Sequence, residues 1–413
     1  MPFFKSFVAV LLLVTLPLGA AQAQHSHKPK PEAPKHPQCA NPNPNPHCAK
    51  VATPALDPQG RLWLAWEQAG RVYVAASADG GASFDAARTI NPERQTIDNN
   101  GDGRPKMAAG ADGALYVSYT ERLAKPFTGH IRFSRSLDGG ATFSPPAIVN
   151  DNREEIGHRF DTLDVAPDGT LAVLWIDKRD IAPAVAAGRP YPGAALYLAV
   201  STDRGARFSP NRKIVDNSCE CCRLAIAHDR QGRRALLWRH VFGADLRDHA
   251  LTTFLDAETA GPIRRVSFDE WHTDACPHHG PALAIDPAGV YHMAWFDDGT
   301  AGQGLFYTQS HDGGQTIGRP MAFGDRARQA SHPALAAAGP ALWLVWIEFD
   351  GQATALKAMR SADGGQSWSA PTTAAQGGAE ADHPQLLVRG GRAYASWLSQ
   401  PEGYRLVALE GRP

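Results

Sequence analysis

The sequence has no long apolar stretch beyond its first residues, and neither sign of charge is in excess. After Leu18 no run approaches the roughly 20 apolar residues that a membrane helix needs, so we expect no membrane span. The 41 Lys and Arg residues are balanced by 42 Asp and Glu residues, which argues against nucleic acid as a partner. Methionine is scarce, with five residues in all, which argues against a methionine-based copper shuttle.

Glycine and proline, in contrast, are abundant. The chain has 39 Gly and 32 Pro residues with short apolar runs between them, a composition typical of an all-β fold rich in turns. A chain of this length would often form several domains, but a β-propeller grows by adding blades rather than domains. Length therefore does not require a split, and we expect one propeller that is a monomer.

The N-terminus has the features of a secretory signal peptide. Lys5 supplies a positive charge, residues 7–18 an apolar core, and residues 21–23 (Ala-Gln-Ala) a small-residue cleavage site. We therefore predict a signal peptide over residues 1–23 and a periplasmic or secreted protein.

A short motif occurs five times along the chain. Each copy has the pattern Ser-x-Asp-x-Gly and most end in an aromatic residue three positions later. The Asp side chain can accept backbone N–H groups within a turn and Gly tolerates positive φ, so the motif predicts a closed hairpin turn. The copies begin at Ser77, Ser136, Ser201, Ser310 and Ser361 and end at Phe84, Phe143, Phe208, Ile317 and Trp368.

A second series of aromatic residues keeps the same period. One aromatic ends an apolar run in each unit, at Trp66, Tyr119, Trp175, Trp238, Trp295, Trp346 and Trp397. Each unit then consists of strands A and B joined by a tight turn, followed by strand C, the motif and strand D. A four-stranded unit of about 50 residues is one propeller blade. We predict seven blades over residues 51–413 with the last one incomplete, and six blades as the alternative. The units begin near Thr53, Arg104, Arg159, Cys222, Pro281, Pro333 and Pro384.

Residues 24–50 differ in composition from the rest. They are rich in Pro and His, which predicts a stiff, extended and solvated linker whose histidines could bind metal ions loosely. Cys39 and Cys48 lie nine positions apart, and in an exported protein this pair is a disulfide candidate.

The five motifs resemble the Asp-boxes of the sialidase (neuraminidase) superfamily. That resemblance implies a sialidase-like propeller and, as one possible activity, a glycoside hydrolase of the exo-α-sialidase type. Arg104 stands where the family has a substrate-binding arginine, and Arg159 and Arg223 could hold equivalent places in later blades. The family would show its Tyr nucleophile near residues 382–384, which here are Asp-His-Pro.

The repeat also predicts which residues meet. In every blade the start of strand A and the end of strand B reach the same rim of the central channel, so these positions should converge. Cysteine and histidine gather there, and three hypotheses follow. The first is a pair of disulfides among the four rim cysteines, Cys219, Cys221, Cys222 and Cys276.

The second hypothesis is a copper or zinc site, because thiolates and imidazoles suit Cu(I) and Zn(II). Its candidate ligands are Cys219, Cys221, Cys222, Cys276, His278, His279, His332 and His383. The alternative expectation is that the protein has no cofactor.

The third hypothesis is catalysis on an anionic or glycan ligand, for which a glycosidase needs two carboxyls at a set separation. Its candidates are Arg104, Arg159, Arg239 and Arg247 for the charge of the ligand, and Asp177, Asp180 and Asp248 as acid or base. Residues 98–103 are rich in oxygen ligands, but they lack the closing Glu of an EF-hand and are interpreted as a turn between blades.

Overall fold

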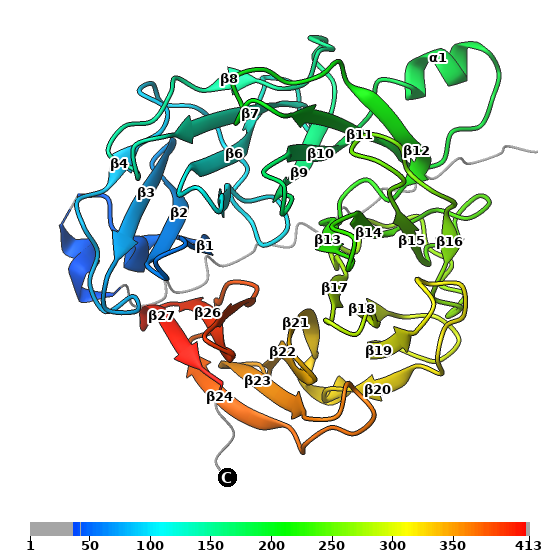
Figure 1. The fold of residues 1–413 in the computed structure, drawn as a ribbon. Coiled ribbons are helices and arrows are strands. Elements are labelled where there is room, and N and C mark those ends of the chain that lie inside the picture. Colours follow the sequence, from blue (N-terminus) through cyan, green and yellow to red (C-terminus); the bar gives the residue numbers. More distant parts are fainter. Residues whose placement is uncertain (1–35, 42, 410–413) are drawn as a thin grey trace, which may run out of the picture. The chain divides into compact units, whose positions relative to one another are not determined.

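Seven antiparallel sheets follow one another around a central opening in the computed structural model of the protein (Figure 1). The structure describes residues 36–41 and 43–409. Six sheets have four strands and the last has three. The predicted seven-bladed propeller with an incomplete last blade is therefore confirmed, and the six-bladed alternative is wrong.

The strands pair in sequence order within each blade. Blades one and two comprise β1 (Ala52–Leu56), β2 (Leu62–Gln68), β3 (Arg71–Ser77), β4 (Arg88–Thr89), β5 (Lys106–Ala109), β6 (Leu115–Arg122), β7 (Gly129–Ser136) and β8 (Ala147–Ile148). Blades three and four comprise β9 (His158–Val165), β10 (Leu171–Asp177), β11 (Ala194–Ser201), β12 (Arg212–Ser218), β13 (Ala225–His228), β14 (Arg234–Arg239), β15 (His249–Thr253) and β16 (Arg264–Arg265). Blades five to seven comprise β17 (Ala282–Ile285), β18 (Tyr291–Asp297), β19 (Gly304–Ser310), β20 (Met321–Phe323), β21 (Ser331–Ala338), β22 (Ala341–Phe349), β23 (Thr354–Ser361), β24 (Thr372–Gly377), β25 (Gln385–Arg389), β26 (Arg392–Ser399) and β27 (Gly403–Ala408).

Helical structure is minor in the part of the chain that the structure describes. One short α-helix, α1 (Ile181–Ala186), lies between β10 and β11, and a 3-10 turn, η3 (Arg326–Arg328), precedes β21. Among residues 36–41 and 43–409, no helix is both long and apolar enough to cross a membrane.

The core consists of apolar clusters that each join two neighbouring blades. The second strand of a blade is buried on both faces, as in β10, where every residue from Leu171 to Asp177 is buried. Its aromatic residue packs against the preceding blade and is fully buried, so truncation to Ala would cost about 3–5 kcal/mol. These residues are Trp66, Tyr119, Trp175, Trp238, Trp295, Trp346 and Trp397, the series predicted from the repeat.

The five motif segments form turns with one shared set of hydrogen bonds. In blade two, Ser136 Oγ donates to Asp138 at 2.7 Å and accepts from the Gly140 amide at 2.9 Å. The Asp138 carboxylate accepts the Thr142 amide at 3.0 Å, and hydrogen bonds from Thr142 lower the pKa of Asp138 to about 2. Both glycines of this turn have positive φ; the second of them is the glycine that all five copies share, whereas Arg204 takes the place of the first in blade three. The same bonds recur in the other four copies.

The described part of the segment before the first blade, residues 36–41 and 43–50, differs from the solvated linker we expected. It forms two 3-10 turns, η1 (Pro37–Ala40) and η2 (Pro46–Cys48), joined by the predicted disulfide between Cys39 and Cys48. His47 is buried, and its Nδ1 accepts the backbone N–H of Tyr404 in blade seven at 3.1 Å. Composition suggested a polyproline-like chain, but the disulfide closes this segment into a loop that packs on the last blade. The predicted signal peptide lies outside the described residues.

Candidate functional site

The entry to each blade and the end of its second strand lie at one rim of the channel. In blade three, for example, His158 at the start of β9 pairs with Asp177 at the end of β10. The rim therefore carries the residues singled out in the sequence. The structure sorts them into two groups, one of thiols and one of histidines, rather than the single site that the sequence suggested.

Three cysteines of the loop between β12 and β13 form the centre of the first group. Cys219, Cys221 and Cys222 are all buried, and Cys219 Sγ lies 3.8 Å from the sulfur of each of the other two. The loop is anchored to blade four, because the Cys219 amide donates to the Arg239 carbonyl at 3.0 Å. The three sulfurs lie within 4.8 Å of one another.

Cys276 reaches this group from the loop between β16 and β17. Its thiol is exposed and interacts with the thiol of Cys221. The four rim cysteines are free in the structure, so the predicted pair of disulfides among them is not formed. We name Cys219, Cys221, Cys222 and Cys276 the thiol cluster.

The electrostatics of the thiol cluster favour a thiolate at Cys219. Hydrogen bonds from Cys221 and Cys222 hold the pKa of Cys219 well below its usual range, although burial acts against this. The guanidinium groups of Arg239 and Arg247 lower it further, and Arg247 Nη1 donates directly to Cys219 Sγ at 3.3 Å. A thiolate is the form of cysteine that binds metals and acts as a nucleophile.

A cavity of about 320 Å³ opens beside the thiol cluster. It is lined by Cys221, Cys276 and His278 on one side and by apolar groups such as Phe160 and Ile176 on the other. His278 thus lies near the thiols, as predicted. The other candidate histidines do not line this cavity.

His279, His332 and His383 form the second group, a stack of imidazole rings. The ring centroids of His279 and His332 are 4.6 Å apart, and those of His332 and His383 are 3.4 Å apart. Burial lowers the pKa of His279 to about 3 and also lowers the pKa values of His332 and His383, so the stack is neutral at pH 7. Asp102 closes one end of the stack, with Oδ1 3.4 Å from Nδ1 of His383.

The arginines proposed for a ligand carboxylate have partners within the protein. Arg104 forms two hydrogen bonds to Asp382, and Arg159 forms two to Asp98. Arg239 donates to the carbonyls of Arg247 and Phe296, at 2.8 and 2.5 Å. Arg247 itself donates to the Thr273 carbonyl and to Cys219. These guanidinium groups hold the rim together, so Arg104 and Arg159 are not free for a substrate carboxylate as the resemblance implied.

The proposed acid and base residues are also engaged by neighbours. Asp177 accepts a hydrogen bond from the indole N–H of Trp175, two residues before it, at 2.7 Å. Glu348 likewise accepts one from the indole N–H of Trp346 at 2.8 Å. In these two blades the carboxylate two positions after the buried aromatic is thus held by the indole of its own strand. Asp180 accepts from the Tyr197 hydroxyl, and Asp248 forms an ion pair with Arg265.

Sequence reasoning missed the part played by Asp102 and a set of three buried carboxylates. Asp102 was assigned to a turn, yet its carboxylate lies beside the histidine stack and pairs with Arg223 Nη1 at 3.1 Å. Asp248, Asp269 and Asp297 place oxygens within 4.8 Å of one another. Burial raises the pKa of Asp297 to about 8. The sequence feature that could have identified Asp102 as a rim residue is its position two residues before Arg104, at the start of a blade.

Comparison with solved structures shows likeness in fold. Polysaccharide lyase Uly1 aligns with a TM-score of 0.54 at 11% identity, over 85% of this chain and 88% of that chain. A PL25 ulvan lyase aligns with a TM-score of 0.53 at 12% identity, over 88% of this chain and 95% of that chain. The Hadza microbial sialidase Hz136 aligns with a TM-score of 0.52 at 15% identity, over 83% of this chain and 74% of that chain. The chain thus has a sialidase-like β-propeller fold, and its structural neighbours include glycoside hydrolase and polysaccharide lyase propellers.

Comparisons of sequence add no relative. No protein-family model matches the chain, and a search of curated proteins finds no match.

Proposed function

We propose that the protein binds a soft or borderline metal ion, Cu(I) or Zn(II), at the thiol cluster. The observation that carries this proposal is the spacing of 3.8 Å between Cys219 Sγ and the sulfurs of Cys221 and Cys222. Sulfurs that each lie about 2.3 Å from zinc at tetrahedral angles are roughly 3.8 Å apart. The unbridged thiols therefore already have the spacing of ligands around one ion.

The charges around the cluster support the same function. Several thiolates around one ion leave a net negative charge, which is costly in a buried site unless a cation offsets it. Arg247 contacts Cys219 Sγ, and Arg239 lies close enough to lower the pKa of the same thiol. Two fixed guanidinium groups thus complement an anionic metal–thiolate centre.

The position of Cys276 supports an ion that exchanges rather than one that is permanently enclosed. Cys276 is exposed, whereas the other three thiols are buried, and it lies at the cavity of about 320 Å³. An incoming ion would meet Cys276 and His278 first and would then pass to Cys221. A closed structural site has no such route.

A glycoside hydrolase is the second candidate function, and only the likeness in fold to a sialidase favours it. Fold does not determine chemistry. Because Arg104 and Arg159 are each held by a carboxylate, binding of an anionic sugar would require both ion pairs to open. We therefore rank metal binding above catalysis and above recognition of a small anion.

We place this function outside the cytoplasm. The predicted signal peptide and the Cys39–Cys48 disulfide both fit an exported protein in an oxidising compartment. N-terminal sequencing of protein from the periplasmic fraction tests this, because export with cleavage would yield a chain that begins at Gln24. A chain that retains its first 23 residues in the cytoplasm would contradict it.

The test of metal binding is a competition titration. Reduced, full-length protein is titrated without oxygen with Cu(I) against the chelator bicinchoninate, and one equivalent is expected to be withheld from the chelator. Cys276→Ser, a change at an exposed position, should weaken Cu(I) binding at least tenfold. Even the loss of a residue that only orients a metal ligand lowers metal affinity by about 10–100-fold. Cys221→Ser should abolish it. The matched control is Cys39→Ser with Cys48→Ser, which leaves the thiol cluster intact. Failure to compete, or equal competition by Cys221→Ser, would refute the proposal.

A further inference from the structure

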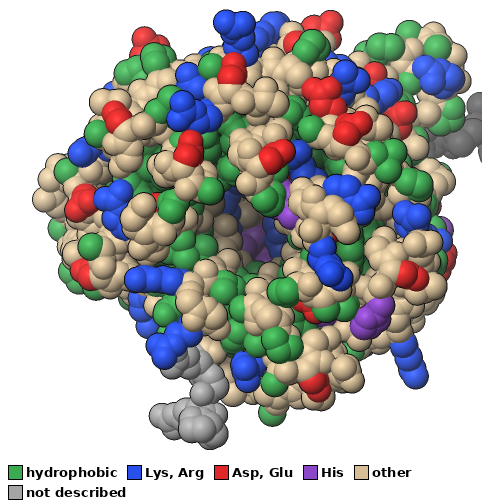
Figure 2. Space-filling view, in the orientation of Figure 1, with side chains coloured by type: hydrophobic (Ala, Val, Ile, Leu, Met, Phe, Trp, Pro, Cys, Tyr) green, Lys and Arg blue, Asp and Glu red, His purple; other side chains and the backbone are tan. Residues whose placement is uncertain are grey.

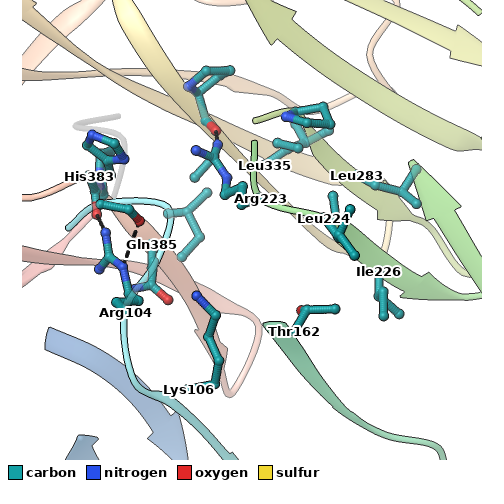
Figure 3. A pocket seen from close by; sticks show the side chains of 18 of the residues that line it. Arg104, Lys106, Thr162, Arg223, Leu224, Ile226, Leu283, Leu335, His383 and Gln385 are labelled. Atoms are coloured by element: carbon teal, nitrogen blue, oxygen red, sulfur yellow. Dashed lines mark hydrogen bonds between the residues drawn. The ribbon is translucent and has the colours of Figure 1, made fainter. Parts of the chain in front are cut away.

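One carboxylate and two imidazoles meet at the centre of the ring. Asp102 precedes β5 in blade two, His332 is the second residue of β21 in blade six, and His383 precedes β25 in blade seven. Their candidate ligand atoms lie within 4.8 Å of one another. Figure 2 shows histidine side chains inside the central opening, and Figure 3 shows His383 at the edge of the central cavity. These residues share no member with the thiol cluster.

The distance between Asp102 and His383 is informative. Oδ1 of Asp102 lies 3.4 Å from Nδ1 of His383, which is longer than the 2.7–3.2 Å of an ordinary N–H···O hydrogen bond. Nitrogen and oxygen atoms that each lie about 2.0–2.2 Å from zinc at tetrahedral angles are roughly 3.3–3.5 Å apart. The pair therefore has the spacing of two ligands on one ion.

The imidazoles have unused nitrogen atoms. Nδ1 of His332 and Nδ1 of His383 are buried, and neither makes an ordinary hydrogen bond among the described residues; His383 Nδ1 has only Asp102 Oδ1 near it, at 3.4 Å. Buried polar atoms are almost always paired, so two unpaired nitrogens beside a carboxylate call for a missing partner. A cation would supply that partner for both.

The surroundings fix part of this geometry in advance. Arg223 donates Nη1 to Asp102 at 3.1 Å and Nη2 to the carbonyl of Pro333 at 2.7 Å, so it ties the carboxylate to the neighbour of His332. Gly101 packs directly under His383, since a Cβ at Gly101 would lie 2.0 Å from Nδ1 and Cε1 of that ring. Asp102 and His383 are therefore held in place, whereas the His332 ring, which stacks on His383 with centroids 3.4 Å apart, must turn before its nitrogen can face the same ion.

We propose that Asp102, His332 and His383 bind one divalent cation of borderline softness, Zn(II) or Cu(II), in a site separate from the thiol cluster. Two imidazoles and one carboxylate suit these ions, whereas the thiol cluster suits Cu(I) or Zn(II). His383 lines the central cavity of about 230 Å³ and His332 lines another of about 520 Å³, so the ion and a further ligand can reach the site. This site goes beyond the proposed function and does not depend on it.

Zinc stoichiometry tests the proposal. The full chain carries His25→Ala and His27→Ala, so that these two histidines of the N-terminal tract do not contribute. After loading with Zn(II) and gel filtration, we expect one zinc ion more per chain in this background than in His383→Gln, which is two against one when the thiol cluster is also loaded. Gly101→Ala should also lose one ion, because its Cβ occupies the position of the imidazole. His272→Gln, at an exposed histidine outside both groups, is the matched control and should lose none.

Cobalt substitution separates the two sites. His383→Gln should keep the sulfur-to-cobalt charge-transfer band of the thiol cluster and lose one cobalt ion. Cys221→Ser should lose that band and retain the cobalt ion of the histidine site. Equal metal content in His383→Gln and its parent would overturn this proposal. A parent protein that binds one cobalt ion but shows no sulfur-to-cobalt charge-transfer band would instead overturn the proposed function. If His383→Gln does not fold, Cu(II) spin resonance of the Cys221→Ser protein decides, because a site without coupling to two imidazole nitrogens would refute the assignment.

Discussion

Arg104 and Asp382 form a buried bidentate ion pair between blades two and seven. Nη1 lies 2.8 Å from Oδ2 and Nη2 lies 2.5 Å from Oδ1, and each side chain is only 4% exposed. Asp382 also accepts the amide of Ala52 in blade one at 3.0 Å. Three blades thus meet at this pair, at the point where the ring closes.

We predict that Arg104→Ala mainly destabilises the protein. Removing the guanidinium leaves Asp382 as an unpaired buried charge, which costs about 3–5 kcal/mol. Urea denaturation monitored by tryptophan fluorescence measures this loss. The control is Arg204→Ala, which removes an exposed ion pair with Asp112 and should change the free energy of unfolding by less than about 1 kcal/mol. If Arg104→Ala had wild-type stability, the ring-closing role would be wrong.

The repeat explains why the fold could be predicted so fully. Each blade buries one aromatic residue at an equivalent position. Residues such as Trp175 and Trp346 therefore identify their blades in the sequence, without knowledge of contacts to distant residues. The turn motif adds local hydrogen bonds that depend only on nearby residues, as between Ser136 and Asp138. Periodic and local signals of this kind are visible in a single sequence.

The site was only partly predictable for the opposite reason. The repeat places residues at the rim, but it does not give their depth or their direction around the channel. Arg104 looked like a ligand-binding residue because its partner, Asp382, is far away in the sequence. The thiols and the stacked histidines were merged into one site because the repeat places both at the rim but does not say how far each side chain reaches into the channel.

The Cys39–Cys48 disulfide should stabilise the segment that packs on blade seven. In the chain-entropy account, a loop of this length contributes about 2–3 kcal/mol. We expect Cys39→Ser with Cys48→Ser to increase amide hydrogen exchange at residues 36–50 and at β27, because His47 accepts a hydrogen bond from the backbone of that strand. Exchange in blades two to five serves as the internal control and should not change. Unaltered protection of β27 would contradict this role.

The buried carboxyl of Asp297 should make stability depend on pH. Burial raises its pKa to about 8, although Arg239 opposes the shift, whereas an unfolded Asp titrates near about 3.9. Between these values the native state holds a proton that the unfolded state does not, so the free energy of unfolding falls as pH rises. We expect the urea midpoint to fall between about pH 6.5 and pH 8, above the range where buried histidines would titrate, and the contribution of Asp297 to this slope to vanish at higher pH. Asp297→Asn should flatten this slope, and Asp298→Asn, at the exposed neighbour, should not. An equal slope in wild type and Asp297→Asn would refute the assignment.

The thiol cluster makes a specific prediction for chemical labelling. In native, metal-free protein an alkylating reagent should modify Cys276 first, because its thiol is exposed, while Cys219, Cys221 and Cys222 react only when the protein unfolds. Mass spectrometry of peptides measures the rates, and Cys39 should stay unlabelled until a reductant is added. Prior loading with Cu(I) should slow the labelling of Cys276, since a bound thiolate is no longer free to attack. A Cys276 rate that is the same with and without Cu(I) would exclude this thiol as a ligand, and a disulfide between Cys221 and Cys276 in freshly isolated protein would show that the cluster is held oxidised.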